Sequence, residues 1–348
     1  MTNLETDPQE QICVADPTGG TAIQVLEPRD VPLGGPRAMT VRRTLPQRGR
    51  SLIGAWCFVD HYGPDALGTR GMNVPPHPHT GLQTVSWLFA GEIEHNDSTG
   101  AHAIVRPGEL NLMTAGQGIQ HSEVSVVAGG DGAATGDRTA TGDGAARSSG
   151  VGDILHGAQL WTALPDAHRH HAPFFERYVP PVFEHEGAQV RVFLGSLLGH
   201  TSTATAFTPI VGAQLDLPAN AAVNIPVDSG FEHGVLVDAG QVTLDGEPVP
   251  RHSIGYRAPG ADGLVITAGD TGARVLLIGG EPLGEQIVMW WNFVGRSHEE
   301  IVAYRAQWQS QVIEATTDDG RFGRVHGYSG GAPLAAPVLP TVRLKPRG

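Results

Sequence analysis

Two pairs of metal-ligating side chains, each with one residue between its members, constrain the fold of this chain most strongly. The pairs are His77 with His79 and His121 with Glu123, and both lie in segments that read as β-strands. Side chains at positions i and i+2 of a strand point to the same face, so each pair directs two donors to one point. We therefore expect two strands that line one barrel and share a single metal ion.

The sequence around both pairs is typical of barrel strands. The first pair follows a Pro-containing loop and precedes the apolar run 82–89, and the second closes segment 107–120, in which turns flank a strand-like stretch. Polar side chains inside a barrel are costly unless something satisfies them, as a metal ion would. Three imidazoles and one carboxylate leave two positions open on a six-coordinate ion, which favours a reactive site over a purely structural one.

Other histidines carry less weight. The chain has 16 histidines, so a chance His-x-His pattern is not rare. The loop 167–171 contains three of them, but it has the composition of a solvated segment. His233 and His252 are isolated in sequence, and we expect them to have structural roles.

Short apolar stretches separated by turns predict an all-β protein with two barrels. The chain has 348 residues with 47 Gly, 26 Pro and 17% charged residues, a composition typical of turn-rich β proteins of about two domains. The second barrel is predicted without metal, because its strand-like stretches contain no His-x-His or His-x-Glu. The expected division is an N-terminal tail (1–21), a metal-binding barrel (22–127), an insert (128–152), a second barrel (153–290), and a helix with a returning tail (291–348).

The segment 128–152 differs from the rest of the chain. It is built almost entirely from Gly, Ala, Asp, Thr, Ser and Arg. Such a segment cannot bury enough apolar surface to offset its ordering entropy, so we expect a disordered loop. It begins five residues after Glu123 and is either an inert expansion or a cover over the mouth of the metal site. Near the end of the chain, Ser297 and Glu300 form a capping-box pattern that predicts a helix over 298–308.

Charge and hydropathy exclude several partners. The formal net charge is −13 with a single lysine, Lys345, which argues against direct binding to nucleic acid. No apolar run of membrane-spanning length exists, and residues 1–11 lack the hydrophobic region of a secretory signal. Cys13 and Cys57 are too few for a disulfide framework. We expect a cytoplasmic monomer with no membrane association.

Two segments carry a family resemblance. Residues 71–91 and 108–123 resemble the two cupin motifs in the variant found in pirins, which place a glutamate two residues after the last histidine, as Glu123 stands here. The resemblance covers about residues 24–325, and the insert departs from it because this connection is shorter in pirins. Further similar stretches are Arg42-Arg43-Thr44-Leu45-Pro46, Phe58-Val59-Asp60-His61-Tyr62-Gly63-Pro64, His95-Asn96-Asp97-Ser98, Leu155-His156-Gly157-Ala158-Gln159-Leu160-Trp161 and Gly280-Glu281-Pro282-Leu283-Gly284-Glu285.

The resemblance implies a bicupin fold of two antiparallel β-barrels, or jelly rolls, whose C-terminal tail packs back on the first barrel. It also implies that His77, His79, His121 and Glu123 hold one iron per chain, although this donor set alone also suits other divalent transition metals. Some pirins are quercetin 2,3-dioxygenases. The resemblance therefore implies an oxidoreductase that uses O₂ to cleave a flavonol or similar enol, with Glu123 as ligand and as acceptor of the substrate hydroxyl proton.

A different class of function stays open. Other pirins act through protein contacts as regulators, so the alternative is a non-enzymatic, redox-sensitive metal-binding protein with a protein partner. A purely structural cupin is the third reading. The lining of the metal pocket would discriminate, because an enzyme needs room for a flat aromatic substrate. The candidate lining residues are Phe58, Asp60, His61, Met72, Gln83, Trp87 and Met113.

Overall fold

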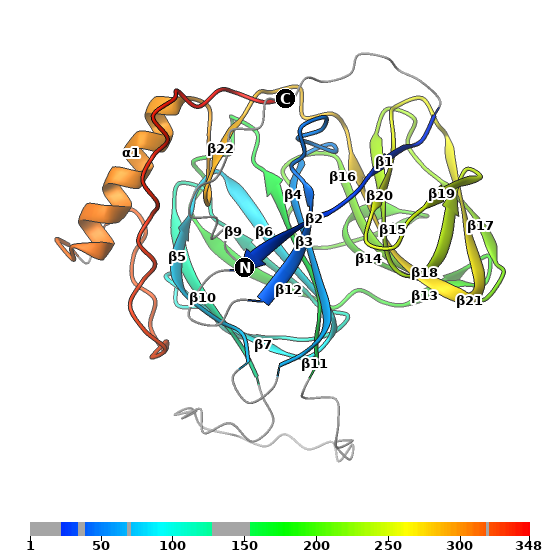
Figure 1. Cartoon of the computed structure of the whole chain (residues 1–348), viewed down its shortest axis with the longest axis horizontal. Coiled ribbons are helices and arrows are strands. Elements are labelled where there is room, and N and C mark those ends of the chain that lie inside the picture. The colour runs from blue at the N-terminus through cyan, green and yellow to red at the C-terminus, as the bar shows by residue number, and fades with distance from the viewer. Residues whose placement is uncertain (1–21, 34–38, 68–70, 127–153, 318–319) are drawn as a thin grey trace.

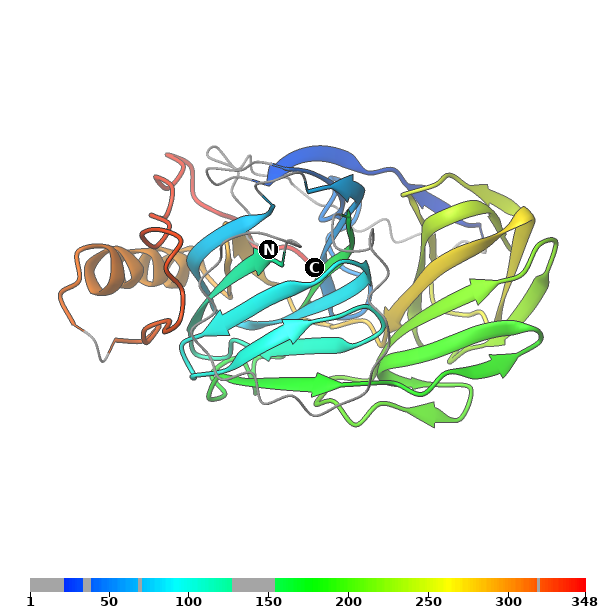
Figure 2. The same cartoon turned by 90° about the horizontal axis from the view of Figure 1, so that it is seen from below.

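The computed structural model describes residues 22–33, 39–67, 71–126, 154–317 and 320–348. Two β-barrels lie side by side, and one helix and the C-terminal tail cover the far side of the first barrel (Figures 1 and 2). The predicted all-β architecture with two cupin-type domains and a short C-terminal helix is confirmed. The expected insert 128–152 and the tail 1–21 lie outside the described residues.

The first barrel consists of two antiparallel sheets that face each other. The smaller sheet has four strands in the order β5 (Asn73–His79), β10 (Ile119–Ser125), β7 (Ile93–Asp97) and β8 (His102–Val105). The larger has seven, in the order β12 (Phe174–Tyr178), β9 (Leu110–Thr114), β6 (Leu82–Ala90), β11 (Ile154–Ala163), β4 (Trp56–Ala66), β3 (Met39–Leu45) and β2 (Arg29–Leu33).

The second barrel is one ten-stranded antiparallel sheet. Its main path is β1 (Gln24–Leu26), β20 (Ile254–Arg257), β18 (Glu232–Leu244), β21 (Gly263–Gly280), β16 (Ile210–Leu217), β14 (Ala188–Leu197) and β13 (Phe183–His185). Three short strands pair at its side: β15 (His200–Thr201), β17 (Ala222–Pro226) and β19 (Glu247–Val249).

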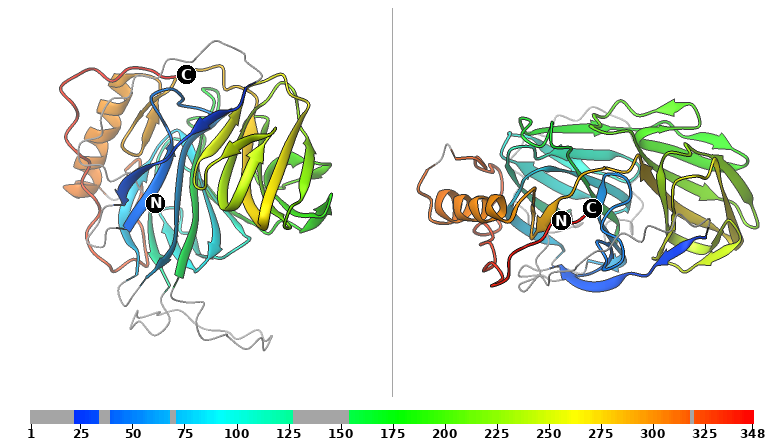
Figure 3. Two further views of the ribbon diagram at one scale, coloured as in Figure 1. Left: turned by 45° about the vertical axis from the view of Figure 1, so that its right-hand side comes forward. Right: turned by 90° about the horizontal axis from the view of Figure 1, so that it is seen from above.

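Strand pairing divides the chain differently from the sequence-based boundaries. Strands β11 and β12 belong to the first barrel, although residues from 153 onwards were expected in the second. Conversely, β1 pairs with β20, so the chain crosses between the barrels near its start (Figure 3). A change in composition at 128 suggests a boundary, but strand partners are set by long-range contacts that composition does not encode.

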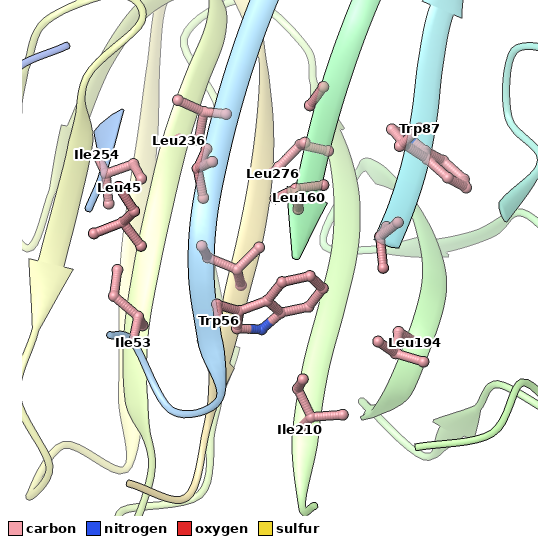
Figure 4. Close-up of a cluster of buried hydrophobic side chains, with 14 of the residues drawn as sticks. Leu45, Ile53, Trp56, Trp87, Leu160, Leu194, Ile210, Leu236, Ile254 and Leu276 are labelled. Carbon is pink, nitrogen blue, oxygen red and sulfur yellow. The ribbon is translucent and has the colours of Figure 1, made fainter. Parts of the chain in front are cut away.

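The outer face of the seven-stranded sheet packs against the second barrel. Trp56 and Leu160 from the first barrel share one apolar cluster with Leu236 and Leu276 from the second (Figure 4). The Trp56 indole nitrogen donates to the carbonyl oxygens of two second-barrel residues at 3.2 and 3.1 Å. The inner face of this sheet is therefore the one that looks toward the four-stranded sheet.

A buried polar cluster also joins the barrels. His61 and His156 of the first barrel donate through Nε2 to Asp238 Oδ1 of the second at 2.7 and 2.6 Å, and Arg274 lies 3.5 Å from the other carboxylate oxygen. Burial raises the pKa of Asp238, but the hydrogen bonds from both imidazoles outweigh it and hold that pKa well below its ordinary value. The carboxylate is therefore ionised and accepts from both rings.

Replacing Asp238 by alanine is expected to lower the free energy of unfolding by ~3 kcal/mol, because two buried imidazole N–H groups lose their acceptor. Urea denaturation followed by circular dichroism measures the change. Asp262→Ala, which removes an exposed carboxylate from the same barrel, is the control and should change stability little. Equal losses in the two variants would show that the cluster contributes nothing specific.

The C-terminal segment covers the strand that carries the first histidine pair. Helix α1 (His298–Trp308) has the predicted span, and the Ser297 side chain accepts from the Glu300 amide. Glu300 does not complete the capping box, because its carboxylate accepts from the Arg296 amide instead. A π-helical turn η2 (Gln309–Ile313) and the hairpin β22 (Val288–Trp290) and β23 (Phe293–Gly295) flank α1.

The tail packs back on the first barrel, as expected. Leu334 N donates to Pro76 O at 2.8 Å, next to His77 in the sequence, and the Trp308 indole donates to Leu334 O at 2.8 Å. Helix and tail thus support β5 from outside. No helix in the described residues has the length and apolar character needed to cross a bilayer.

Candidate metal centre

Neighbouring strands β5 and β10 bring the two sequence pairs together. The strands are antiparallel, and His77 lies directly opposite His121 in their register. A register shift between His121 and Glu123 places Glu123 opposite Val74. The side chains of His77, His79 and His121 are fully buried, and Glu123 is 1% exposed.

Three imidazoles converge on one point. The donor nitrogens of His77, His79 and His121 lie within 4.8 Å of one another, and the Nε2 atoms of His79 and His121 are 3.1 Å apart. His77 Nδ1 donates to Pro75 O at 2.9 Å, which orients its ring. The Nε2 atom of His77 then carries a buried lone pair that accepts no hydrogen bond from the described residues. This arrangement fits a metal ion, since an outer hydrogen bond on the far nitrogen is the usual way to fix a ligating imidazole.

The protonation state of the histidines also suits a metal. Burial lowers the pKa of His77 to about 3 and the pKa values of His79 and His121 well below the ordinary 6.5. All three rings are therefore neutral near pH 7. Neutral imidazole is the form that binds metal, so no proton has to be displaced from these nitrogens.

Glu123 lies beside His121, together with a histidine that the sequence analysis missed. Donor atoms of His95, His121 and Glu123 lie within 4.8 Å of one another. His95 Nδ1 is 3.3 Å from His121 Nδ1, and His95 Nε2 is 3.1 Å from Asp97 Oδ2. The chain from His121 through His95 to Asp97 is a relay of hydrogen bonds that would orient His121 with Nε2 free for a metal.

The signal for His95 was present but weak. His95 and Asp97 form an i,i+2 pair in a pirin-like stretch, but a His-x-Asp pair alone does not show which strand lies beside it. Only the pairing of β7 with β10, which sets His95 opposite Glu123, brings the pair to the metal centre. This pairing is a long-range contact.

Some of the expected pocket residues do face the metal centre. Phe58 stacks on Trp161 with ring centroids 4.0 Å apart, and Trp161 meets His79 edge-on at 5.1 Å. Met113 packs in the same apolar cluster as this aromatic pair. Asp60, two residues after Phe58, shares its face.

Met72 belongs to a separate apolar cluster with Tyr62 and Val74. It therefore does not pack with the aromatic pair beside His79.

Three expected lining residues point the other way. His61 bonds to Asp238, Gln83 donates to Thr205 O at 3.0 Å, and Trp87 stacks on Phe193 of the second barrel at 4.6 Å. Successive side chains of a strand point alternately into the barrel and toward the interface between the barrels, and these three side chains point toward the interface. They contribute to the contact between the barrels and not to the pocket.

A second group of possible ligands is the His61, His156 and Asp238 cluster between the barrels. The Nε2 atoms of both imidazoles bond to the Asp238 carboxylate, and Arg274 already compensates its charge. Within the described part of the chain, His233 and His252 belong to no group of three ligands. The structure therefore favours the first barrel as the place for a metal.

Family comparisons agree with this fold. The Pirin family model matches residues 38–162, and the model of the Pirin C-terminal cupin domain matches residues 212–314. A Pseudomonas aeruginosa protein named "Putative quercetin 2,3-dioxygenase" is 38% identical over 320 residues, 91% of each chain. A pirin-like protein of Caulobacter vibrioides is 31% identical over 293 residues, 81% of this chain and 92% of the relative.

Solved structures give the same result. A quercetin 2,3-dioxygenase from Acinetobacter baumannii superposes with a TM-score of 0.79 at 36% identity, covering 92% of this chain and 97% of that one. A bacterial pirin from Escherichia coli, solved in complex with nickel(II), has a TM-score of 0.53 at 18% identity, over 75% of this chain and 100% of that one, and supports the fold alone. Sequence, strand order and buried donor set lead to one conclusion: this chain belongs to the pirin family.

Proposed function

We propose that the protein is a metal-dependent dioxygenase that uses O₂ to cleave a flavonol or a similar enol. In this proposal, one iron per chain is held by His77, His79, His121 and Glu123. One observation carries the proposal: three buried, neutral imidazoles converge beside an aromatic pair, Phe58 and Trp161. The family relatives that carry the name quercetin 2,3-dioxygenase add support.

The choice of iron rests on the family resemblance. The donor set of nitrogen and oxygen atoms suits several divalent transition metals, and copper or zinc would bind more tightly by intrinsic affinity. A bound iron would supply Lewis acidity toward the substrate oxygens and the redox capacity that O₂ chemistry needs.

The residues of the chain have separate tasks. The three histidines and Glu123 hold the metal, and the relay through His95 and Asp97 fixes the ring of His121. The stacked rings of Phe58 and Trp161 offer an apolar face to a flat substrate. The Glu123 carboxylate would accept the proton of the substrate hydroxyl, and its burial keeps competing water away.

Oxygen uptake tests the proposal. Iron-loaded protein with quercetin is expected to consume O₂ in proportion to its bound iron. The His77→Ala/His121→Ala variant should consume none above background. Iron-loaded protein that consumes no O₂ with quercetin or related flavonols would contradict the dioxygenase and favour the regulatory alternative.

A further inference from the structure

The inner face of the seven-stranded sheet carries two parallel rows of side chains, one mainly aromatic and one polar. In the aromatic row, strand pairing sets Phe58 opposite Trp161 and Met113 opposite Phe175. This row is next to the metal centre, because Trp161 contacts His79 and Phe175 stacks on His95 at 4.7 Å.

The polar row lies two residues farther along each strand. It consists of Asp60, Gln159, Ser86 and Asn111, each directly opposite the next in the strand register. Side chains two residues apart on a strand share a face, so this row also points into the first barrel, about 7 Å from the aromatic row. All four side chains are buried, with exposures of 0%, 0%, 5% and 3%.

Hydrogen bonds satisfy Asp60 and Ser86 in this polar row but not the amides of Gln159 and Asn111 in full. Arg43 donates to both oxygens of Asp60 at 2.7 and 2.9 Å, which neutralises the carboxylate. Ser86 Oγ donates to Gln159 Oε1 at 2.9 Å. Gln159 Nε2 and both polar atoms of the Asn111 amide, Nδ2 and Oδ1, have no hydrogen-bond partner among the residues that the structure describes.

Two more donors on the same face are unsatisfied. Trp161 Nε1 and the Tyr62 hydroxyl are buried and have no hydrogen-bond partner in the described part of the chain. Roughly 90% or more of buried polar groups in native proteins are hydrogen-bonded, so a group of unsatisfied atoms on one inner face needs a partner from outside the described residues. Ordered water is one such partner, and a ligand is the other.

We propose that Asn111 and Gln159 form a subsite that binds ring hydroxyl groups of a planar aromatic ligand. The inference rests on the proposed function and deepens it, since the ligand's chelating oxygens would lie at the metal and its further hydroxyls at the polar row. An amide both donates and accepts, which suits a hydroxyl group. Arg43 already pairs with Asp60, and none of the four side chains of the row is a cation. The row therefore does not favour a carboxylate or phosphate.

Stability of the free protein tests whether the Asn111 amide lacks a partner. Asn111→Leu should leave the melting temperature unchanged or raise it, because it removes no hydrogen bond from the chain. The control is Gln214→Leu, which removes a buried amide that accepts from Trp87 and donates to Asp216, and it should lower the melting temperature. Equal lowering in both variants would overturn the subsite.

Ligand binding without O₂ tests the recognition itself. Metal-loaded protein is titrated anaerobically with quercetin and with 3-hydroxyflavone, which has the same chelating oxygens but no other hydroxyls. Asn111→Leu and the volume-conserving Gln159→Met should each weaken quercetin binding about tenfold, as expected for one lost hydrogen bond, and change 3-hydroxyflavone binding less than about twofold.

The outcomes separate the two proposals. Equal binding of both ligands by the wild type, or equal losses for both ligands in the variants, would overturn the subsite and leave the dioxygenase in place. Selective binding without turnover would support the subsite and contradict the dioxygenase. Failure of the metal-loaded protein to bind either ligand would overturn both.

Discussion

Replacing His77 and His121 together by alanine is expected to reduce bound metal from about one ion per chain to nearly none. Each substitution removes a buried, neutral nitrogen that the structure directs to one point, and two remaining donors do not hold a divalent ion against a chelator. Metal content is measured by mass spectrometry after dialysis against a weak chelator. The matched control, His170→Ala/His326→Ala, removes two exposed histidines and should retain the metal.

The same measurement separates a ligand from an orienting residue. His95→Ala should weaken metal affinity about 10–100-fold without abolishing binding, since His95 acts on His121 through a hydrogen bond. Complete loss of metal in His95→Ala would make His95 a ligand itself. Equal metal content in the double-alanine variant and the wild type would remove the site from the first barrel.

Glu123→Gln is expected to lower dioxygenase activity about 10²–10⁴-fold at matched iron content, the range typical for loss of a general base. Glutamine keeps an oxygen that can bind the metal, but it does not accept the substrate proton. Oxygen uptake per bound iron is the measurement. Glu94→Gln, which changes a carboxylate paired with the exposed His102 on the same sheet, should retain activity.

Iron-loaded Glu123→Gln has a second possible result, which would change the role assigned to Glu123. Activity close to the wild-type value in iron-loaded Glu123→Gln would show that another group takes the proton. The dioxygenase proposal would survive that result, but the role of Glu123 would be reduced to metal binding.

Local periodicity explains what the sequence could predict. The alternation of a strand is enough to place His77 and His79 on one face, and the capping pattern at Ser297 is enough to begin the helix at His298. Both signals span only a few residues. They do not depend on which strand lies beside which.

The sequence could not predict features that depend on long-range strand pairing. The role of His95 needs the β7 and β10 pairing, and the polar row at Asn111 and Gln159 needs the register of four strands. The sequence also does not show which face of a strand points into the barrel, and His61 and Trp87 are directed toward the second barrel only when the first barrel closes. For the same reason, composition did not assign β11 to the first barrel.

Anomalous diffraction at the metal absorption edge tests the central claim most directly. In crystals of the metal-loaded protein, we predict one peak per chain, about 2.0–2.3 Å from the Nε2 atoms of His77, His79 and His121 and from a carboxylate oxygen of Glu123. Absence of a peak there, or a peak of comparable height in the second barrel near His233 or His252, would contradict the account.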